Sequence, residues 1–359
     1  MHLDDLALIK ELDSQNMLEH INHLPDQLAE AWKLGFSLPL PKMGYFNHVV
    51  IAGMGGSAIG GDLVQAYANI YSEIPITVLR DYDLPQWQNT LVICSSHSGN
   101  TEETLSVFDQ AVERGLPTLA ICTGGKLAEK ARQADTPLWI FEDDFQPRAA
   151  VGYSFGLLLA ALTRLGMFEV EHTASEVLAA VQAMKAQQVD LQPEVFAPHN
   201  PAKRLAGQFV GRWVTVFGSG FLAPVARRWK TQINEIAKAQ AAFEILPEAD
   251  HNTLQGINFP EANANHSLAF FITSKLNHPR HRIREEYTRK AFMLEAISTD
   301  FFRVRGKRVM EDMWSALHMG DYIAFYLSVA YQIDPTPVPM LEQLKIYLNN
   351  TGNEKLHED

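Results

Sequence analysis

Residues 90–104 of this 359-residue chain read Thr90-Leu-Val-Ile-Cys-Ser-Ser-His-Ser-Gly-Asn-Thr-Glu-Glu-Thr104. The apolar run that ends at Cys94 predicts a buried strand, and the apolar spacing over 105–112 predicts a helix. A hydroxyl-rich loop therefore leads from a strand into a helix N-terminus. The first backbone N–H groups of a helix lack partners within the helix and attract anions. This stretch predicts an α/β fold with a phosphate site.

The composition of the loop favours a phosphate over a simple helix cap. A cap needs one hydroxyl, followed by acidic residues in the first turn. Here four hydroxyl side chains and one glycine fall between residues 95 and 101. Gly99 allows the turn and a close approach of the anion. The predicted phosphate ligands in this loop are Ser96, Ser98 and Thr101.

Outward from this loop, short apolar runs alternate with helical patterns. The runs that predict strands are 48–52, 76–79, 91–94, 118–122 and 138–141, and in a second series 213–220, 268–273 and 301–305. Strands that alternate with helices indicate βαβ units and parallel sheets. The predicted fold class is α/β, with two doubly wound parallel-sheet domains and flanking helices.

These patterns divide the chain into five segments. They are an N-terminal helical arm (1–42), a first α/β domain with the phosphate loop (43–167), a linker helix (168–199), a second α/β domain (200–335) and a C-terminal helix and tail (336–359). The segment after Thr273 lacks the glycine and the hydroxyl spacing of the first loop. We therefore expect one phosphate site per chain.

Composition limits the partners and the compartment. The net charge of -12 argues against nucleic acid or an anionic membrane as the main partner. Cys94 and Cys122 both lie in apolar runs, which indicates buried thiols and neither disulfides nor a zinc site. The N-terminus lacks a basic region with an apolar signal core, and no apolar run is long enough to span a bilayer. We expect a cytoplasmic enzyme.

A second glycine-rich loop follows the first predicted strand. It reads Gly53-Met-Gly-Gly-Ser-Ala-Ile-Gly-Gly61, and it fits the dinucleotide pattern G-x-G-x-x-G/A. One interpretation is an NADP-dependent dehydrogenase, with Arg80 binding a 2′-phosphate. The other places both loops at the carboxyl ends of neighbouring strands, where one small phosphorylated ligand touches both. In that case Gly55 and Gly56 give a close backbone approach and Ser57 adds a hydroxyl.

Four further residues are candidates for chemistry, and each also has an ordinary structural interpretation. Arg148 either forms a surface ion pair or stabilises a negatively charged intermediate. Glu235, in the helical stretch 229–238, either pairs with the lysine three residues later or acts as a base. His251 is in a turn-like segment. Lys345 falls on a helical stripe of three leucines, past which it can extend towards water.

Six motifs in order closely resemble those of the bifunctional phosphoglucose/phosphomannose isomerases, which are built from two sugar isomerase (SIS) domains. The motifs are Gly-Met-Gly-Gly-Ser (53–57), Ser-His-Ser-Gly-Asn-Thr-Glu-Glu-Thr (96–104), Gln-Pro-Arg-Ala-Ala (146–150), Trp-Lys-Thr-Gln-Ile-Asn-Glu (229–235), Pro-Glu-Ala-Asp-His-Asn (247–252) and Leu-Lys (344–345). The resemblance covers nearly the whole chain after residue 40. It implies a sugar phosphate as the substrate and no metal or redox cofactor.

The resemblance also implies roles for the candidate residues. Glu235 is the base of an aldose–ketose isomerisation through an enediol, and His251 opens the sugar ring. The phosphate ligands are Ser57, Ser96, Ser98 and Thr101, and the remaining active-site cations are Arg148 and Lys345. In this superfamily the histidine typically enters the site from the neighbouring subunit, so the resemblance implies a homodimer.

Chemistry supports these roles. A carboxylate with a suitable pKa can move the proton between C2 and C1, a group that titrates near neutrality suits ring opening, and a fixed cation stabilises the enediolate. Members with mannose activity have a threonine seven residues before the terminal lysine, where this chain has Val338, with Thr336 nearby. Mannose 6-phosphate is therefore expected as a substrate if Thr336 or a bound water replaces that hydroxyl. The alternative function is a non-catalytic phosphosugar sensor.

Overall fold

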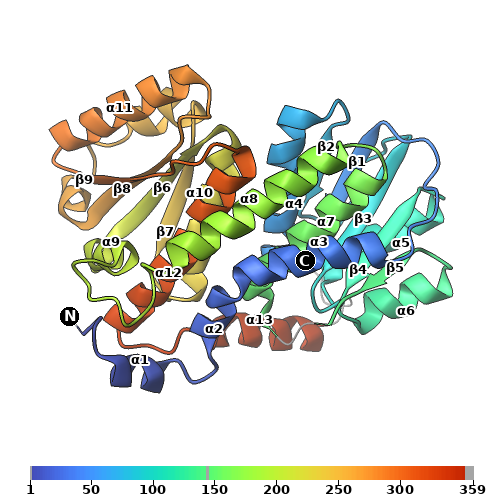
Figure 1. The fold of residues 1–359 in the computed structure, drawn as a ribbon, viewed down its shortest axis with the longest axis horizontal. Coiled ribbons are helices and arrows are strands. Elements are labelled where there is room, and N and C mark those ends of the chain that lie inside the picture. Colours follow the sequence, from blue (N-terminus) through green and yellow to red (C-terminus); the bar gives the residue numbers. More distant parts are fainter. Residues whose placement is uncertain (1, 143–144, 352–359) are drawn as a thin grey trace.

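The computed structural model describes residues 2–142 and 145–351, and it contains two parallel sheets with helices on both sides (Figure 1). The N-terminal helices and the first unit comprise α1 (Leu6–Leu12), α2 (Met17–Asn22), α3 (Leu24–Ser37), β1 (His48–Ala52), α4 (Gly55–Tyr71), β2 (Ile76–Leu79), β3 (Thr90–Ser96), α5 (Glu102–Glu113), β4 (Thr118–Cys122), α6 (Gly125–Gln133), β5 (Leu138–Ile140), the 3-10 turn η1 (Pro147–Ala149) and α7 (Val151–Arg164). The remaining elements are α8 (Val170–Gln188), α9 (Pro201–Phe209), β6 (Trp213–Ser219), η2 (Gly220–Leu222), α10 (Ala223–Glu235), β7 (Ala241–Leu246), η3 (Glu248–His251), η4 (Thr253–Gln255), η5 (Glu261–His266), β8 (Ser267–Thr273), α11 (Pro279–Leu294), β9 (Ser298–Arg303), α12 (Val309–Ala330) and α13 (Pro339–Asn350).

The first sheet confirms the five strands that the sequence predicts. Its order is β2-β1-β3-β4-β5, and every pairing is parallel. Each residue of β3 and β4 is buried, because helices cover both faces of this sheet. Ala52 pairs with Cys94, so the loops after β1 and β3 leave the sheet side by side at its carboxyl edge.

The second sheet differs from the prediction in one strand and one boundary. Its order is β7-β6-β8-β9, again parallel. The sequence interpretation overlooked β7, an edge strand whose half-exposed residues lack a continuous apolar run. It also placed the last strand at 301–305, whereas β9 begins at Ser298 with three polar residues. The α/β fold class is nevertheless confirmed.

The predicted N-terminal helices contact both units. Helix α3 packs closely on α7, because a Cβ at Gly152 or Gly156 would collide with Gln27 or Ala31. Helices α1 and α2 contact α12 instead, and His318 of α12 bonds through Nε2 to the carbonyl of Ile21. The N-terminal helices therefore connect the two units.

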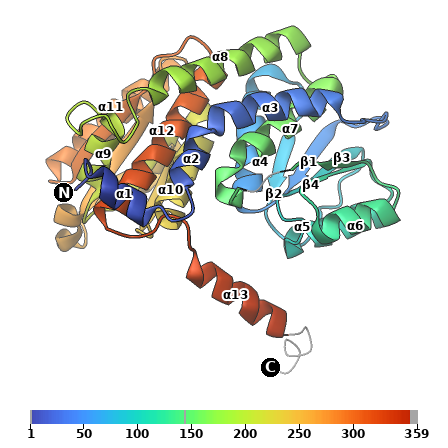
Figure 2. The ribbon, with the colours of Figure 1, turned by 60° about the horizontal axis from the view of Figure 1, so that its bottom comes forward.

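Two helices, α8 and α13, lie outside the helix layers that cover the sheets. The predicted linker helix is α8, which contacts α3, α7 and α12 and runs alongside both units (Figure 1). Helix α13 extends away from the two units (Figure 2). Its leucines Leu341 and Leu344 are exposed, so no described part of the chain covers the predicted apolar stripe.

The two cysteines and the helices agree with what the sequence predicts about thiols and membrane spans. Cys94 and Cys122 are both free and buried, as predicted, and burial raises the pKa of Cys122 to about 11. Within residues 2–142 and 145–351, every helix is too short or too polar to cross a lipid bilayer.

Candidate active site

The predicted phosphate loop joins the carboxyl end of β3 to the N-terminus of α5. The hydroxyl groups of Ser96 and Thr101 lie 2.9 Å apart and share a hydrogen bond. Thr101 is the N-cap of α5, but its side chain does not bond to the first N–H groups of that helix. Those donors remain available to an anion. Ser98 lies at the exposed rim, where its Oγ accepts a hydrogen bond from the backbone of Asn100.

A second loop, after β4, braces the phosphate loop. The Thr123 hydroxyl donates to the carbonyl of His97 over 2.7 Å, and the Leu127 N–H donates to the carbonyl of Gly99 over 2.9 Å. Gly99 has φ +67° and Gly125 also has φ +67°. A Cβ on either glycine would collide with a carbonyl of the opposite loop. The two loops are therefore interlocked.

The first turn of α4 forms the other wall of the cradle. Ser57 is buried, and its Oγ accepts a hydrogen bond of 3.3 Å from the N–H of His97. Gly55 has φ +51°, which favours glycine, and Gly56 lies against the carbonyl of Pro147, where a Cβ would not fit. The structure thus brings Ser57, the phosphate loop and η1 together.

Arg148, on η1, is a buried cation next to this cradle. Its Nη2 donates to the carbonyl of Thr336, while its Nε is buried without a hydrogen-bond partner among the described residues. Burial lowers the pKa of Arg148, and the nearby carboxylate of Glu235 acts in the opposite direction. Within residues 2–142 and 145–351, Arg148 does not form the surface ion pair that the sequence allowed. Its Nε keeps an unused hydrogen-bond donor.

Glu235 is the last residue of α10, and the chain turns sharply after it. The sequence indicated a helical stretch through residue 238, whereas the helix ends at Glu235. The pair with Lys238, one of the two alternatives for Glu235, is not found among the described residues. Lys238 has φ +51°, and its Nζ donates to the carbonyls of Asp334 and Pro335, each over 2.8 Å. The Asn234 side chain closes the turn by donating to the carbonyl of Ala239.

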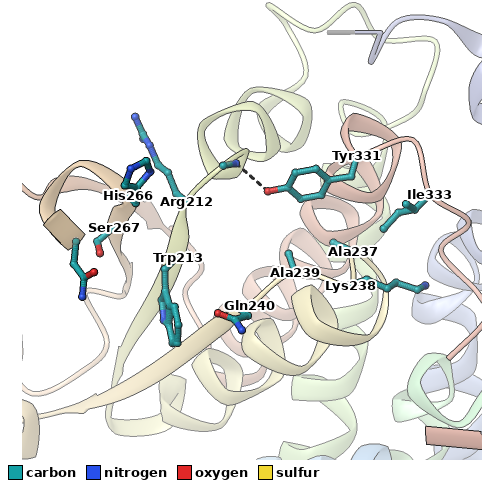
Figure 3. A pocket seen from close by; sticks show the side chains of 12 residues that line it. Arg212, Trp213, Ala237, Lys238, Ala239, Gln240, His266, Ser267, Tyr331 and Ile333 are labelled. Atoms are coloured by element: carbon teal, nitrogen blue, oxygen red, sulfur yellow. Dashed lines mark hydrogen bonds between the residues drawn. The ribbon is translucent and has the colours of Figure 1, made fainter. Parts of the chain in front are cut away.

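Lys238 is therefore a component of the site that the sequence interpretation missed. Burial and the charge of Arg148 lower the pKa of Lys238 to about 8, against the opposing effect of Asp334 and Glu235. Figure 3 shows its side chain pointing away from Arg212 and Trp213, which line a cavity of about 620 Å³ at the amino edge of the second sheet. Lys238 borders that cavity, but the charge of Arg148 acts on its side chain, which therefore belongs to the Arg148 cluster.

A buried ion pair between Arg228 and Asp321 packs against the cluster of Arg148, Glu235 and Lys238. Arg228 of α10 donates two hydrogen bonds to the carboxylate of Asp321 in α12. Its Nη2 lies 2.8 Å from one carboxylate oxygen and its Nε lies 3.1 Å from the other. The same Nη2 donates to the carbonyl of Arg148 over 2.6 Å. Arg228 and Asp321 are almost fully buried. The pair thus fixes η1 relative to α10, and with it Arg148 relative to Glu235.

His251 and Lys345 lie apart from the cluster. His251 is exposed at the end of η3, and neither side chain forms a hydrogen bond or ion pair within the part of the chain that the structure describes. Helix α13 begins close to the site, since the carboxylate of Glu342 acts on the charge of Arg148. Lys345 lies one turn further along, on an exposed surface.

The structure does not support the interpretation of the glycine-rich loop after β1 as a dinucleotide-binding site. Arg80, proposed to bind a 2′-phosphate, donates instead to Asp62 of α4 over 2.5 Å. Asp62 also accepts from Arg227 of α10 over 3.1 Å, so this carboxylate joins the two units. Gly53 lies against the carbonyl of Ser95 in β3 and Gly56 against that of Pro147 in η1, so these two glycines serve close contacts within the protein. In the described ranges, no three His, Cys, Asp or Glu side chains are grouped to hold a metal ion.

Known proteins resemble this chain in sequence and in fold. Residues 198–348 match the family model "Bacterial phospho-glucose isomerase C-terminal SIS domain". A bifunctional phosphoglucose/phosphomannose isomerase of Caldicellulosiruptor bescii is 37% identical, over 92% of this chain and 98% of the relative. That of Aquifex aeolicus is 30% identical, over 84% and 90%. A hypothetical protein from Thermus thermophilus has a similar structure, with a TM-score of 0.73, 15% identity, and 98% and 94% of the two chains covered.

Proposed function

The chain belongs to the family of bifunctional phosphoglucose/phosphomannose isomerases, and we propose on this premise that it interconverts glucose 6-phosphate and mannose 6-phosphate with fructose 6-phosphate. The observation that carries the proposal is the contact series from the phosphate loop through Gly56 and η1 to the buried Arg148 beside Glu235. This series provides a phosphate cradle, a cation and a carboxylate in one region. A sensor would need only the cradle.

In the proposed reaction the phosphate group anchors the sugar and Glu235 moves the proton. The backbone N–H groups of α5, with Ser57, Ser96, Ser98 and Thr101, bind the phosphate. Glu235 removes the proton at C2 of the aldose and returns it to C1, which gives the ketose. The negative charge of the enediolate oxygen is stabilised by the free donor of Arg148, which burial keeps away from competing water.

The direct test is to incubate the purified protein with fructose 6-phosphate and to quantify glucose 6-phosphate and mannose 6-phosphate separately. We expect both products. If only glucose 6-phosphate forms, the chain is a phosphoglucose isomerase without the second activity. If neither forms while fructose 6-phosphate still binds, the sensor function replaces the proposal.

Mannose activity is expected to depend on Thr336. Its hydroxyl is buried without a hydrogen-bond partner among the described residues, and its carbonyl accepts from Arg148. Val338, at the N-cap of α13, has no hydroxyl to offer. We expect Thr336→Val to lower the yield of mannose 6-phosphate about tenfold relative to glucose 6-phosphate, the loss typical of one hydrogen bond. Thr351→Val, at the far end of α13, is the matched control; an unchanged product ratio in Thr336→Val would contradict this role.

We further propose a homodimer in which His251 completes the site of the neighbouring subunit. Two exposed features support it. His251 lies outside the cluster of its own chain, and the apolar residues Leu341 and Leu344 of α13 are uncovered. The dimer would give both features a partner surface.

Hybrid dimers test this arrangement. Glu235→Gln and His251→Asn homodimers are each expected to be nearly inactive. Mixing and re-equilibrating the two variants should restore about a quarter of the wild-type rate, because half of the dimers are hybrids and each hybrid has one intact site. Mixing Glu235→Gln with itself is the control. Recovery that does not exceed the sum of the two variants would place His251 in the site of its own chain.

The activity is also expected to fall above about pH 8. As the pH rises through the pKa of Lys238, its ammonium group loses its charge, and its bonds to Asp334 and Pro335 weaken next to the segment that holds Arg148. Lys238→Arg keeps the charge to much higher pH, so the fall should move upward in the pH–rate profile. Lys10→Arg on α1 is the control. A profile that is the same in Lys238→Arg and wild type would assign the fall to another group.

We propose the cytoplasm as the compartment. The free, buried Cys94 and Cys122 support it, since reduced thiols are usual there.

A further inference from the structure

The strands common to the two sheets have the same order, so the second unit has a position that corresponds to the phosphate site of the first. The residues at that position are different. Strands β6, β8 and β9 occupy the places of β1, β3 and β4. Strand β3 ends at the hydroxyl of Ser96 and β8 ends at the hydroxyl of Thr273. The next helix has its N-cap at the same distance along the chain, at Thr101 in one unit and His278 in the other.

The loop after β8 does not itself form a cradle. The Ser274 hydroxyl donates to Asp312 over 2.5 Å, and the Asn277 side chain donates to the carbonyl of Ser219 over 2.9 Å. The N-terminus of α11 is capped by the ring of His278, which accepts from the N–H of Arg280. The loop after β8 therefore does not repeat the phosphate loop, as the sequence predicts.

A groove lies beside this loop, between α11 and the edge strand β9. Its cavity has a volume of about 750 Å³. Phe301 pairs with Phe271 and Arg303 pairs with Thr273, so these four side chains share the sheet face that α11 covers. In the first unit both α5 and α6 cover the corresponding face. In the second, the helix after β9 is α12, which packs on the opposite face and leaves the groove open.

The groove collects positive charge in an acidic chain. Its cations are Lys275, Arg282, Arg289 and Arg303. None of these four side chains forms a hydrogen bond or an ion pair within residues 2–142 and 145–351. The groove also holds two carboxylates. Glu285 accepts from the Ser219 hydroxyl over 2.8 Å, and Glu286 pairs with Lys290 at 3.0 Å. The charges of Arg282 and Arg303 also act on Glu285, and that of Arg289 acts on Glu286, so the four cations exceed the two carboxylates by two.

Two buried donors in the groove also lack partners. Thr273 lines the cavity and is only 9% exposed, yet its Oγ1 has no hydrogen-bond partner in the described chain. The buried Nε of Arg289 likewise lacks one, while the guanidinium lies 4.9 Å from the ring centroid of Phe301. Arg303 lies 5.3 Å from the same centroid, so both guanidinium groups lie against the ring of Phe301.

We propose that this groove is a second anion site, which binds the phosphate group of a phosphorylated small molecule. Guanidinium groups offer paired donors that match phosphate oxygens, and the Thr273 hydroxyl adds a neutral donor. The site lies in the second unit, on the α11 face of its sheet, and uses charged side chains. The substrate cradle uses hydroxyl and backbone donors. The two sites are thus chemically distinct and are predicted to respond differently to substitution.

Equilibrium dialysis with radiolabelled inorganic phosphate at low ionic strength tests the proposal. The wild-type chain should bind two phosphates, and Ser96→Ala/Thr101→Val, which removes two of the four hydroxyl ligands of the cradle and weakens that site, should still bind one with unchanged affinity. Arg289→Gln/Arg303→Gln should weaken that remaining binding about tenfold or more. The charge-matched control Arg280→Gln/Arg132→Gln alters exposed arginines outside the groove and should keep both sites. Thr273→Val, which removes only the hydroxyl, is a milder variant should the double variant fold poorly.

Two outcomes would overturn the proposal. One is the loss of all phosphate binding in Ser96→Ala/Thr101→Val, which would leave the cradle as the one site. The other is equal binding by the groove variants and the charge-matched control. Repeating the dialysis with glycerol 3-phosphate separates the sources: competition by the ester at the groove indicates a phosphate monoester, whereas binding of the inorganic ion alone indicates free phosphate.

Discussion

Glu235→Gln is expected to lower the turnover of fructose 6-phosphate by about 10²- to 10⁴-fold, the range typical of a lost general base. The amide has nearly the shape of the carboxylate but cannot take the proton from the sugar carbon. Binding should persist, because the phosphate loop and the first turn of α4 do not contact residue 235 through any described hydrogen bond. Turnover and substrate affinity are measured separately, the latter by calorimetry.

The matched control for this variant is Glu113→Gln. Glu113 ends α5 as Glu235 ends α10, so the same substitution is made at a helix end far from the cluster. It should leave turnover unchanged. Near-normal turnover of Glu235→Gln would remove this residue from the mechanism. A parallel loss of binding would instead assign it to positioning the sugar.

Arg228→Met is expected to lower the free energy of unfolding by about 3–5 kcal/mol, the loss typical when one partner of a buried ion pair is removed. The carboxylate of Asp321 would remain buried without its cation. Burial already raises the pKa of Asp321, and Arg228 opposes that shift, so the variant should favour the protonated acid. The carbonyl of Arg148 would also lose its donor. Urea unfolding at pH 7 measures the loss.

The double variant Arg228→Met/Asp321→Leu separates charge from packing. It removes both charges, so it should recover most of the stability lost in Arg228→Met. Turnover should not recover with it, because η1 still lacks the donor that fixes Arg148. If the double variant is as unstable as the single one, packing and not the unpaired carboxylate accounts for the loss.

Most of the fold was predictable from the sequence because its central strands are buried on both faces. The five strands of the first sheet are nearly continuous apolar runs, and each was predicted within about two residues. Strand β7 was missed and β9 was misplaced for the opposite reason. Both are edge strands with exposed residues, and their register depends on the neighbouring strands and not on a local pattern.

The site was only partly predictable. The proximity of Ser57 to the loop at Ser96 follows from the parallel order of β1 and β3, and the structure brings them together. The participation of Lys238 depends on a left-handed turn after Glu235, and Thr336 comes from a segment more than 180 residues after Arg148. No local pattern signals either contact. The roles assigned to the site residues remain predictions.

The interlocked glycines of the two loops restrict how this protein can change. A side chain at Gly99 would displace the loop after β4, and one at Gly125 would displace the phosphate loop. Neither glycine can be substituted alone, so these two loops do not tolerate the sequence variation that is usual in surface loops. A new shape of the predicted phosphate loop would therefore require both loops to be rebuilt together.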